Sequence, residues 1–138
     1  MSFPLDPRLA ADTHPIGEMP LSRLLLMDDA RHPWLILVPR IAGARELMDL
    51  DVVDRAALFD EITAVSRAME TLLRPDKLNV AALGNVVAQL HVHVIARYAD
   101  DANWPHPVWG RGERVAYARE DAVARIAELR AALKEQLA

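Results

Sequence analysis

Two histidines separated by one residue, His91 and His93, are the side chains of this chain best suited to chemistry. They lie in the stretch Gln89-Leu90-His91-Val92-His93-Val94-Ile95, which alternates polar and apolar residues with the two-residue period of a β-strand. This period places Gln89, His91 and His93 on one face of the strand and the apolar residues on the other. The strand rise separates neighbouring same-face residues by roughly 6.5–7 Å, so both imidazoles could engage one phosphate group.

Three interpretations of the histidine pair are open. The pair could lie on the solvated face of an amphipathic strand, since imidazoles are common on partly buried surfaces. It could bind a metal ion, but no carboxylate follows at short range, and Arg97 shares the histidines' strand parity, where its charge would oppose a cation. In the third interpretation one neutral imidazole attacks phosphorus while the other binds or protonates an oxygen.

The segment resembles the histidine triad (HIT) motif of nucleotide hydrolases and transferases, with Gln89 in place of the first histidine. The apolar run from Trp34 to Arg40 is similar to the family's strand ending in Pro-Lys/Arg. The Gly84-Asn85-Val86-Val87 turn resembles the turn that enters the triad strand, and Trp104-Pro105 resembles the aromatic segment after it. The likeness covers roughly residues 20 to 110.

The resemblance implies roles for the two histidines. His91 matches the central histidine, which in the family attacks the α-phosphorus and forms a nucleotidyl-histidine intermediate. His93 matches the last histidine and is expected to contact the phosphate as charge develops. A nucleophilic imidazole must be neutral and oriented through its other nitrogen, and the backbone carbonyl of Gln89 could supply that contact.

Four further residues are candidates for substrate binding. Gly84 and Asn85 could form a backbone nest with an added amide for a phosphate, although Gly-Asn is also an ordinary turn sequence. Asp28 resembles the residue that holds the ribose hydroxyls in family members, and it could equally be a turn residue. Arg97 could contact phosphate, but as a residue at the strand end it could also be a solvated charge.

Two positions depart from the family pattern. Gln89 cannot carry a proton in the physiological range, and Trp34 stands where the family often has a fourth histidine. A nucleotide-binding regulator without turnover is therefore the alternative to an enzyme.

The spacing predicts an α+β fold with an antiparallel sheet in one domain. Strands are expected over 21–27, 34–38, 77–83 and 89–97, and helices over 51–73 and 119–137, with Asp51 capping the first helix. Short connections within each strand pair favour antiparallel pairing. We expect residues 1–20 to be an irregular arm and residues 21–138 to be the HIT-like domain. The aromatic segment 103–109 is expected to approach the nucleotide site or a dimer partner.

Composition restricts the class of protein. A chain of 138 residues that is 52% hydrophobic can bury a core, and the lack of cysteine excludes disulfides and thiolate chemistry. A net charge of −4 argues against a broad nucleic-acid surface, and no apolar run is long enough to span a membrane. The expectation is a cytoplasmic enzyme that acts at the α-phosphate of a purine nucleotide derivative. No metal or cofactor is expected, and the resemblance implies a homodimer.

Overall fold

An antiparallel sheet of five strands in the order β1-β2-β3-β5-β4 forms the centre of the computed structural model, which describes residues 3–138. The strands are β1 (Thr13–Glu18), β2 (Ser22–Met27), β3 (Trp34–Pro39), β4 (Lys77–Ala81) and β5 (Val92–Arg97). The helices are α1 (Pro7–Asp12), α2 (Val52–Leu73) and α3 (Arg119–Ala132), with a short 3-10 helix η1 at Leu47–Asp49.

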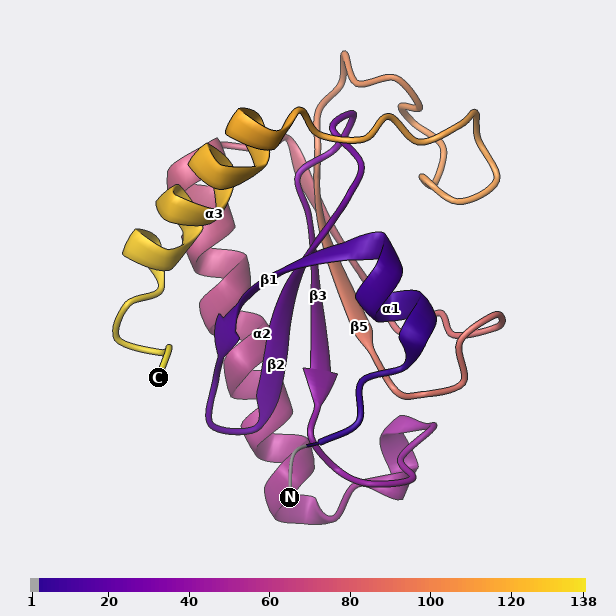
Figure 1. The fold of residues 1–138 in the computed structure, drawn as a ribbon, viewed down its shortest axis with the longest axis vertical. Helices are drawn as coiled ribbons and strands as arrows, with labels where there is room; N and C mark the ends of the chain where they lie inside the picture. The colour runs from indigo at the N-terminus through magenta and orange to yellow at the C-terminus, as the bar shows by residue number, and fades with distance from the viewer. Residues whose placement is uncertain (1–2) are drawn as a thin grey trace.

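The two faces of the sheet are covered differently. Helices α2 and α3 lie on one face and the short α1 lies on the other, as Figure 1 shows. The α2/α3 face holds a core that includes Val65, Met69, Leu129 and Leu133. The opposite face holds a second cluster, in which Leu9 of α1 packs with residues of β2, β3 and β5. All six residues of β3 are buried, which explains why this strand reads as a continuous apolar run.

Helix α2 has clear ends. The side chain of Asp51 accepts a hydrogen bond from Asp54 N at 2.8 Å and so caps the first turn. At the other end Arg74 adopts the left-handed conformation with φ 48°, and Pro75, whose ring bars further helix, follows.

The expected α+β fold with an antiparallel sheet and two main helices is confirmed. Three element ends differ from the expectation by two residues or more: β4 ends at Ala81, β5 begins only at Val92, and α3 ends at Ala132. The late start of β5 has a local cause. The N–H of Leu90 donates to the carbonyl of Ala44 at 3.0 Å, so the backbone here is tied to the loop after β3 instead of to β3 itself.

The expectation of an irregular segment over residues 1–20 is wrong for most of its length, and residues 1–2 lie outside the described part of the chain. Pro7 begins α1 at a position that favours proline, and Asp6 caps this helix. Thr13–Glu18 then pairs with β2 as the edge strand β1, with a register irregularity between Pro15 and Gly17. Proline is tolerated on such an edge strand.

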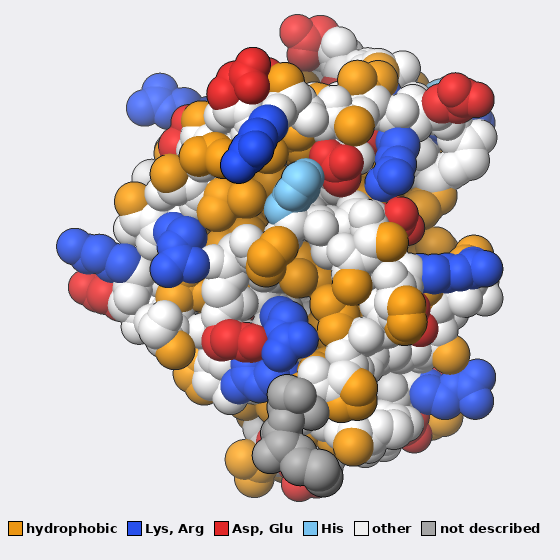
Figure 2. Space-filling view, in the orientation of Figure 1, with side chains coloured by type: hydrophobic (Ala, Val, Ile, Leu, Met, Phe, Trp, Pro, Cys, Tyr) orange, Lys and Arg blue, Asp and Glu red, His pale blue; other side chains and the backbone are white. Residues whose placement is uncertain are grey.

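Between residues 3 and 138 no helix is long and apolar enough to cross a membrane. On the face shown in Figure 2, Lys and Arg side chains are interspersed with acidic and apolar ones and form no broad basic area.

Candidate active site

The two histidines lie at the start of β5, on the sheet face that carries α1. Both side chains are buried, with 5% of His91 and 3% of His93 exposed, and their ring centroids are 4.8 Å apart. Val92 and Val94 point to the opposite face, where they pack in the clusters that adjoin α2. The predicted alternation is therefore present, even though His91 precedes the paired part of the strand.

The orientation of His91 is fixed by its own chain. Its Nδ1 lies 2.7 Å from the carbonyl oxygen of Gln89. A carbonyl oxygen can only accept, so the proton of the neutral ring is on Nδ1 and the lone pair is on Nε2. Gly84 lies against the same ring: a Cβ at this position would come within 3.4 Å of His91 Cε1 and 2.6 Å of the Val87 carbonyl oxygen. Only glycine therefore fits here, because the Val87 carbonyl lies too close for any side chain.

His93 has the opposite tautomer. The indole N–H of Trp34 donates to His93 Nδ1 at 2.9 Å. An indole nitrogen can only donate, so Nδ1 is the acceptor and the proton of the neutral ring is on Nε2, which lies 3.3 Å from the Leu83 carbonyl oxygen. Burial, together with a smaller effect of the nearby His91, lowers the pKa of His93 to about 4. His93 is thus a neutral hydrogen-bond donor near neutral pH.

Two cavities meet at the histidines. The larger, of about 530 Å³, has a mainly apolar lining that includes Leu9, Met27, Val87 and Trp109 and reaches both histidines. The smaller, of about 140 Å³, is polar, and its lining includes Arg45, Glu46, Gly84, Asn85, Gln89 and His91. Asn85 and His91 line both. His91 therefore stands where an apolar chamber joins a polar one.

A cavity of about 750 Å³ lies elsewhere, between α2 and α3. Its lining includes Asp60, Arg67 and Arg74 but no histidine, and it is on the other face of the sheet from His91 and His93. Size alone therefore does not identify the chemical site.

Four of the expected site residues join His91 at the cavities, namely Gly84, Asn85, Gln89 and His93. Asp28 does not line either cavity. Its Oδ1 accepts from the Tyr117 N–H at 3.0 Å and lies 3.0 Å from His14 Nε2, so it ties the end of β2 to β1 and to the segment before α3.

Arg97 is neither a solvated charge nor a residue of the cavities. Its side chain is buried and forms a paired contact with Asp101, at 2.8 and 3.1 Å, and a third hydrogen bond to Asn79 at 3.0 Å. Three of the five N–H groups of this guanidinium therefore donate to protein groups. It holds the loop after β5 in place.

That loop brings one of its two tryptophans to the site. The Trp109 ring contacts the His93 ring edge-on, with centroids 5.0 Å apart, and lines the larger cavity. The Trp104 ring instead lies over the guanidinium of Arg97, at 5.8 Å. Trp109 therefore lies at the candidate site, as expected for segment 103–109, whereas Trp104 packs on Arg97.

Helix α1 contributes residues that the sequence analysis missed. Arg8, Leu9 and Asp12 line the larger cavity beside the histidines. No motif marks them, and their place depends on the pairing of β1 with β2. The helix is tied to the histidine strand by Gln89, whose Oε1 accepts from Asp6 N at 2.8 Å and whose Nε2 donates to the Pro4 carbonyl at 2.9 Å.

Within residues 3–138 no group of three His, Asp or Glu side chains is placed to hold a metal ion. The site is thus defined by two buried histidines of opposite tautomer on one strand of an α+β sheet.

Comparisons with known proteins identify the family to which a chain with this fold and site belongs. Residues 8–100 match the HIT domain family, and the chain belongs to that family. Three solved structures are similar over nearly the whole chain. A histidine triad protein from Marinobacter aquaeolei VT8 is 47% identical, with a TM-score of 0.94 and coverage of 97% of this chain and 98% of the other.

A histidine triad protein from Bradyrhizobium japonicum is 46% identical, with a TM-score of 0.92 and full coverage of both chains (100% and 100%). One from Sinorhizobium meliloti 1021 is 43% identical, with a TM-score of 0.92 and coverage of 99% of this chain and 98% of the other. No protein among the curated ones matches the chain.

Proposed function

We propose that the protein binds a purine nucleotide derivative and hydrolyses or transfers it at the α-phosphate through a covalent nucleotidyl-His91 intermediate. One observation carries this proposal: His91, whose neutral ring has its lone pair on Nε2 because Nδ1 donates to the Gln89 carbonyl, lies where an apolar cavity joins a polar one. A nucleotide joins a planar base, which packs against apolar side chains, to a charged phosphate, so two adjoining cavities of this kind suit it.

In the proposed first step, His91 Nε2 attacks the α-phosphorus. A P–N bond forms, and the bond from phosphorus to the leaving group breaks, with the electron pair and a solvent proton going to the leaving group. The imidazolium that forms keeps its Nδ1–H on the Gln89 carbonyl, which stabilises the positive charge. Water then attacks phosphorus, the P–N bond breaks, the lone pair returns to Nε2, and the water proton goes to solvent.

His93 is proposed to assist as a neutral donor. Its Nε2–H has only the 3.3 Å contact to Leu83 O, which is long for a hydrogen bond. A phosphate oxygen in the cavity would be a stronger acceptor because it is charged. Gly84 and Asn85 line both the polar cavity and the approach to His91, and they are proposed to hold the phosphate.

We place Gln89 at the position of the first triad histidine. Its side chain is engaged with Pro4 and Asp6 and cannot relay a proton, which is the observation that favours the alternative, a nucleotide-binding protein with little or no turnover.

Intact-mass measurement separates the two functions. The protein is mixed with a nucleoside phosphoramidate or a dinucleoside polyphosphate and quenched at alkaline pH, where a P–N bond survives. We expect one added nucleotidyl group and release of nucleoside monophosphate, both absent from His91→Ala. His93→Ala should retain the adduct while turnover falls by about 10²–10³.

A wild-type protein whose melting temperature rises with nucleoside monophosphate, but which shows neither adduct nor product, would be a binder only. Undiminished turnover by a folded His91→Ala protein would rule out the covalent route.

We also propose a homodimer located in the cytoplasm. β4 pairs only with β5 within the described chain, so its outer edge is free to pair, and Val80 on this strand is 50% exposed. Light scattering should give the mass of a dimer, and Val80→Lys should shift it toward monomer. Fractionation of cells tests the location.

A further inference from the structure

We propose that α1 is a substrate-binding wall of the nucleotide site and that Gln89 is the positioning residue that seats it. This inference rests on the proposed function and adds to it a purpose for the residue that replaces a histidine. Its starting point is the pair of hydrogen bonds from the Gln89 amide to the Asp6 N–H and the Pro4 carbonyl, at 2.8 and 2.9 Å.

The amide of glutamine suits this contact chemically. Its oxygen accepts and its nitrogen donates from one planar group, so it can bind a backbone N–H and a backbone C=O that are two residues apart. A neutral imidazole has one donor and one acceptor on separated ring atoms and cannot match both groups of so short a segment. A histidine at position 89 would therefore release at least one of them.

The contact is placed directly before α1. Asp6, whose N–H binds Gln89, also caps the helix: its side chain accepts from Arg8 N at 2.8 Å and its carbonyl accepts from Ala10 N at 3.0 Å. The amide of Gln89 thereby fixes the first turn of a six-residue helix, which is too short to be stable alone. Leu9 completes the seating by packing on the sheet, where it is 5% exposed.

Once seated, α1 presents two charged side chains to the larger cavity. Arg8 and Asp12 line it together with His91 and His93. Asp12 is the carboxylate that lines this cavity, and its one side-chain partner in the described chain is the half-exposed Arg114, at 3.5 Å, whereas Asp28 lies outside the cavity and binds His14 and the Tyr117 N–H. We therefore assign the hydroxyls of a ribose to Asp12. The surface that α1 presents to the cavity thus combines the cation of Arg8, the carboxylate of Asp12 and the apolar side chain of Leu9.

The nucleophile does not depend on the Gln89 side chain. His91 is oriented by the backbone carbonyl of residue 89, which every amino acid supplies. Replacing the side chain should therefore raise KM, because substrate binding is weakened. It should leave kcat nearly unchanged, because the chemical step is spared.

The experiment uses Gln89→Met, which keeps the length of the side chain and removes both hydrogen bonds. We expect KM and the Kd for adenosine monophosphate to rise about tenfold while kcat stays within about threefold of wild type. Amide exchange of residues 5–12 should become about tenfold faster in the free protein. Gln89→His should act in the same direction, and Gln89→Glu, which keeps the acceptor for Asp6 N, should fall between.

Two further variants separate the effect of the Gln89 hydrogen bonds from that of the α1 residues that line the cavity. Asp12→Ala should raise Kd for adenosine monophosphate but not for its 2′,3′-dideoxy form, and should leave the exchange of residues 5–8 unchanged. Gln136→Met, the same substitution on the C-terminal side of α3, is the matched control and should alter neither binding nor exchange of residues 5–12.

The outcomes are distinct. If wild type binds nucleotide but Gln89→Met leaves Kd and KM unchanged, the wall is wrong and the proposed function stands. Fast exchange of α1 with unchanged affinity would likewise overturn the wall, reducing Gln89 to a structural contact. If wild type binds no nucleotide, the proposed function fails and the inference fails with it. A higher turnover of Gln89→His than of wild type would overturn the wall and show that position 89 acts in proton transfer instead.

Discussion

At the scale of single residues, the two positions where the sequence analysis expected the family to have histidine each make a specific contact. Gln89 binds the segment before α1, and Trp34 donates to His93. The pattern of histidines could be read from the sequence, and so could the contact of His91 with the Gln89 carbonyl, because strand period and backbone geometry are local. The partners of Gln89 and Trp34 could not, because they lie 83 and 59 residues away in the chain.

The contact from Trp34 makes a prediction about the tautomer of His93. Trp34→Phe removes the N–H donor and leaves an aromatic ring, so His93 Nδ1 loses its partner and some of the neutral ring should carry its proton there. The loss should also cost about 1–2 kcal/mol of stability. Nitrogen-15 spectra of the imidazoles measure the tautomers directly. Trp109→Phe is the control, since Trp109 makes only an edge contact with the same ring.

An unchanged spectrum in Trp34→Phe would mean that burial and Leu83, and not the indole, set the tautomer.

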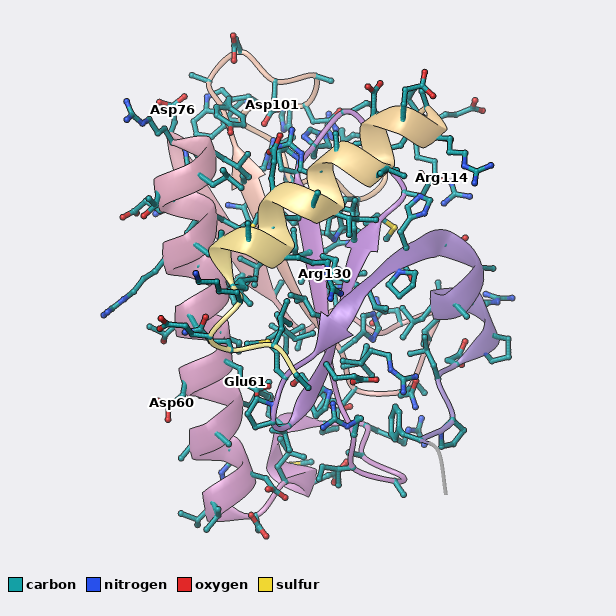
Figure 3. All side chains as sticks on the ribbon, turned by 60° about the vertical axis from the view of Figure 1, so that its left-hand side comes forward. Asp60, Glu61, Asp76, Asp101, Arg114 and Arg130 are labelled. Atoms are coloured by element: carbon teal, nitrogen blue, oxygen red, sulfur yellow. The ribbon has the colours of Figure 1, made fainter. Side chains whose placement is uncertain are left out.

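At the scale of elements, the long helices and the inner strands were predictable, and α1 and β1 were not. Helix α2 has a cap, an apolar stripe and a terminating proline, all of which are local signals. β1 contains Pro15 and Gly17, which oppose strand formation, and it exists because β2 offers a free edge. Arg130 of α3 also donates to the Ile16 carbonyl, and Figure 3 shows this side chain reaching toward β1.

The junction of α2 with the sheet depends on a buried carboxylate. Glu61 accepts from the backbone N–H groups of Leu21 and Ser22 at 2.7 and 2.9 Å and is 6% exposed. Glu61→Ala leaves both groups buried without partners and should lower the free energy of unfolding by about 2–4 kcal/mol. Urea unfolding measures it. Asp60→Ala should change it by less than about 0.5 kcal/mol, because Asp60 points away from the sheet in Figure 3.

Equal unfolding midpoints for the Glu61→Ala and Asp60→Ala proteins would contradict this account of how β2 is anchored.

The loop after β5 depends on a second buried contact. Burial alone would raise the pKa of Asp101, but hydrogen bonds from Arg97 and from the Tyr98 and Asn103 N–H groups outweigh burial and hold this pKa well below its usual range. Asp101→Asn leaves the Arg97 charge buried without its counter-ion and should cost about 3–5 kcal/mol. Denaturant unfolding is again the measurement.

Asp100→Asn, on the exposed neighbour, is the control and should have almost no effect. Because the loop carries Trp109 to the cavity, we expect Asp101→Asn also to raise the Kd for adenosine monophosphate. A stable Asp101→Asn protein with wild-type affinity would show that the loop is held by other contacts.

At the scale of the whole molecule, one face of the sheet is used for stability and the other for the site. The α2/α3 face is packed with aliphatic side chains, whereas the α1 face buries two imidazoles and the indole of Trp34, with the partly buried Trp109, beside a cavity. Burying groups that can become charged makes the stability of the fold depend on pH.

The pH dependence has a definite sign. In the unfolded chain His93 titrates near pH 6.5, whereas in the fold its pKa is about 4. Between these values the unfolded chain binds more protons, so stability falls as the pH is lowered through this window and is unaffected above it. The shift corresponds to about 3 kcal/mol lost between pH 7 and pH 4. Burial also lowers the pKa of His32, which adds to the loss.

The carboxylates do not obscure this window. Hydrogen bonds hold the pKa values of Asp28, Asp29 and Asp101 below their usual range despite burial, so their stabilisation is lost only at lower pH. Urea unfolding at pH 7 and pH 4.5 should therefore show a large decrease for wild type and a smaller one for His93→Gln. His106→Gln, at an exposed histidine, should keep the wild-type decrease. Parallel profiles for wild type and His93→Gln would place the acid sensitivity of this fold outside the candidate site.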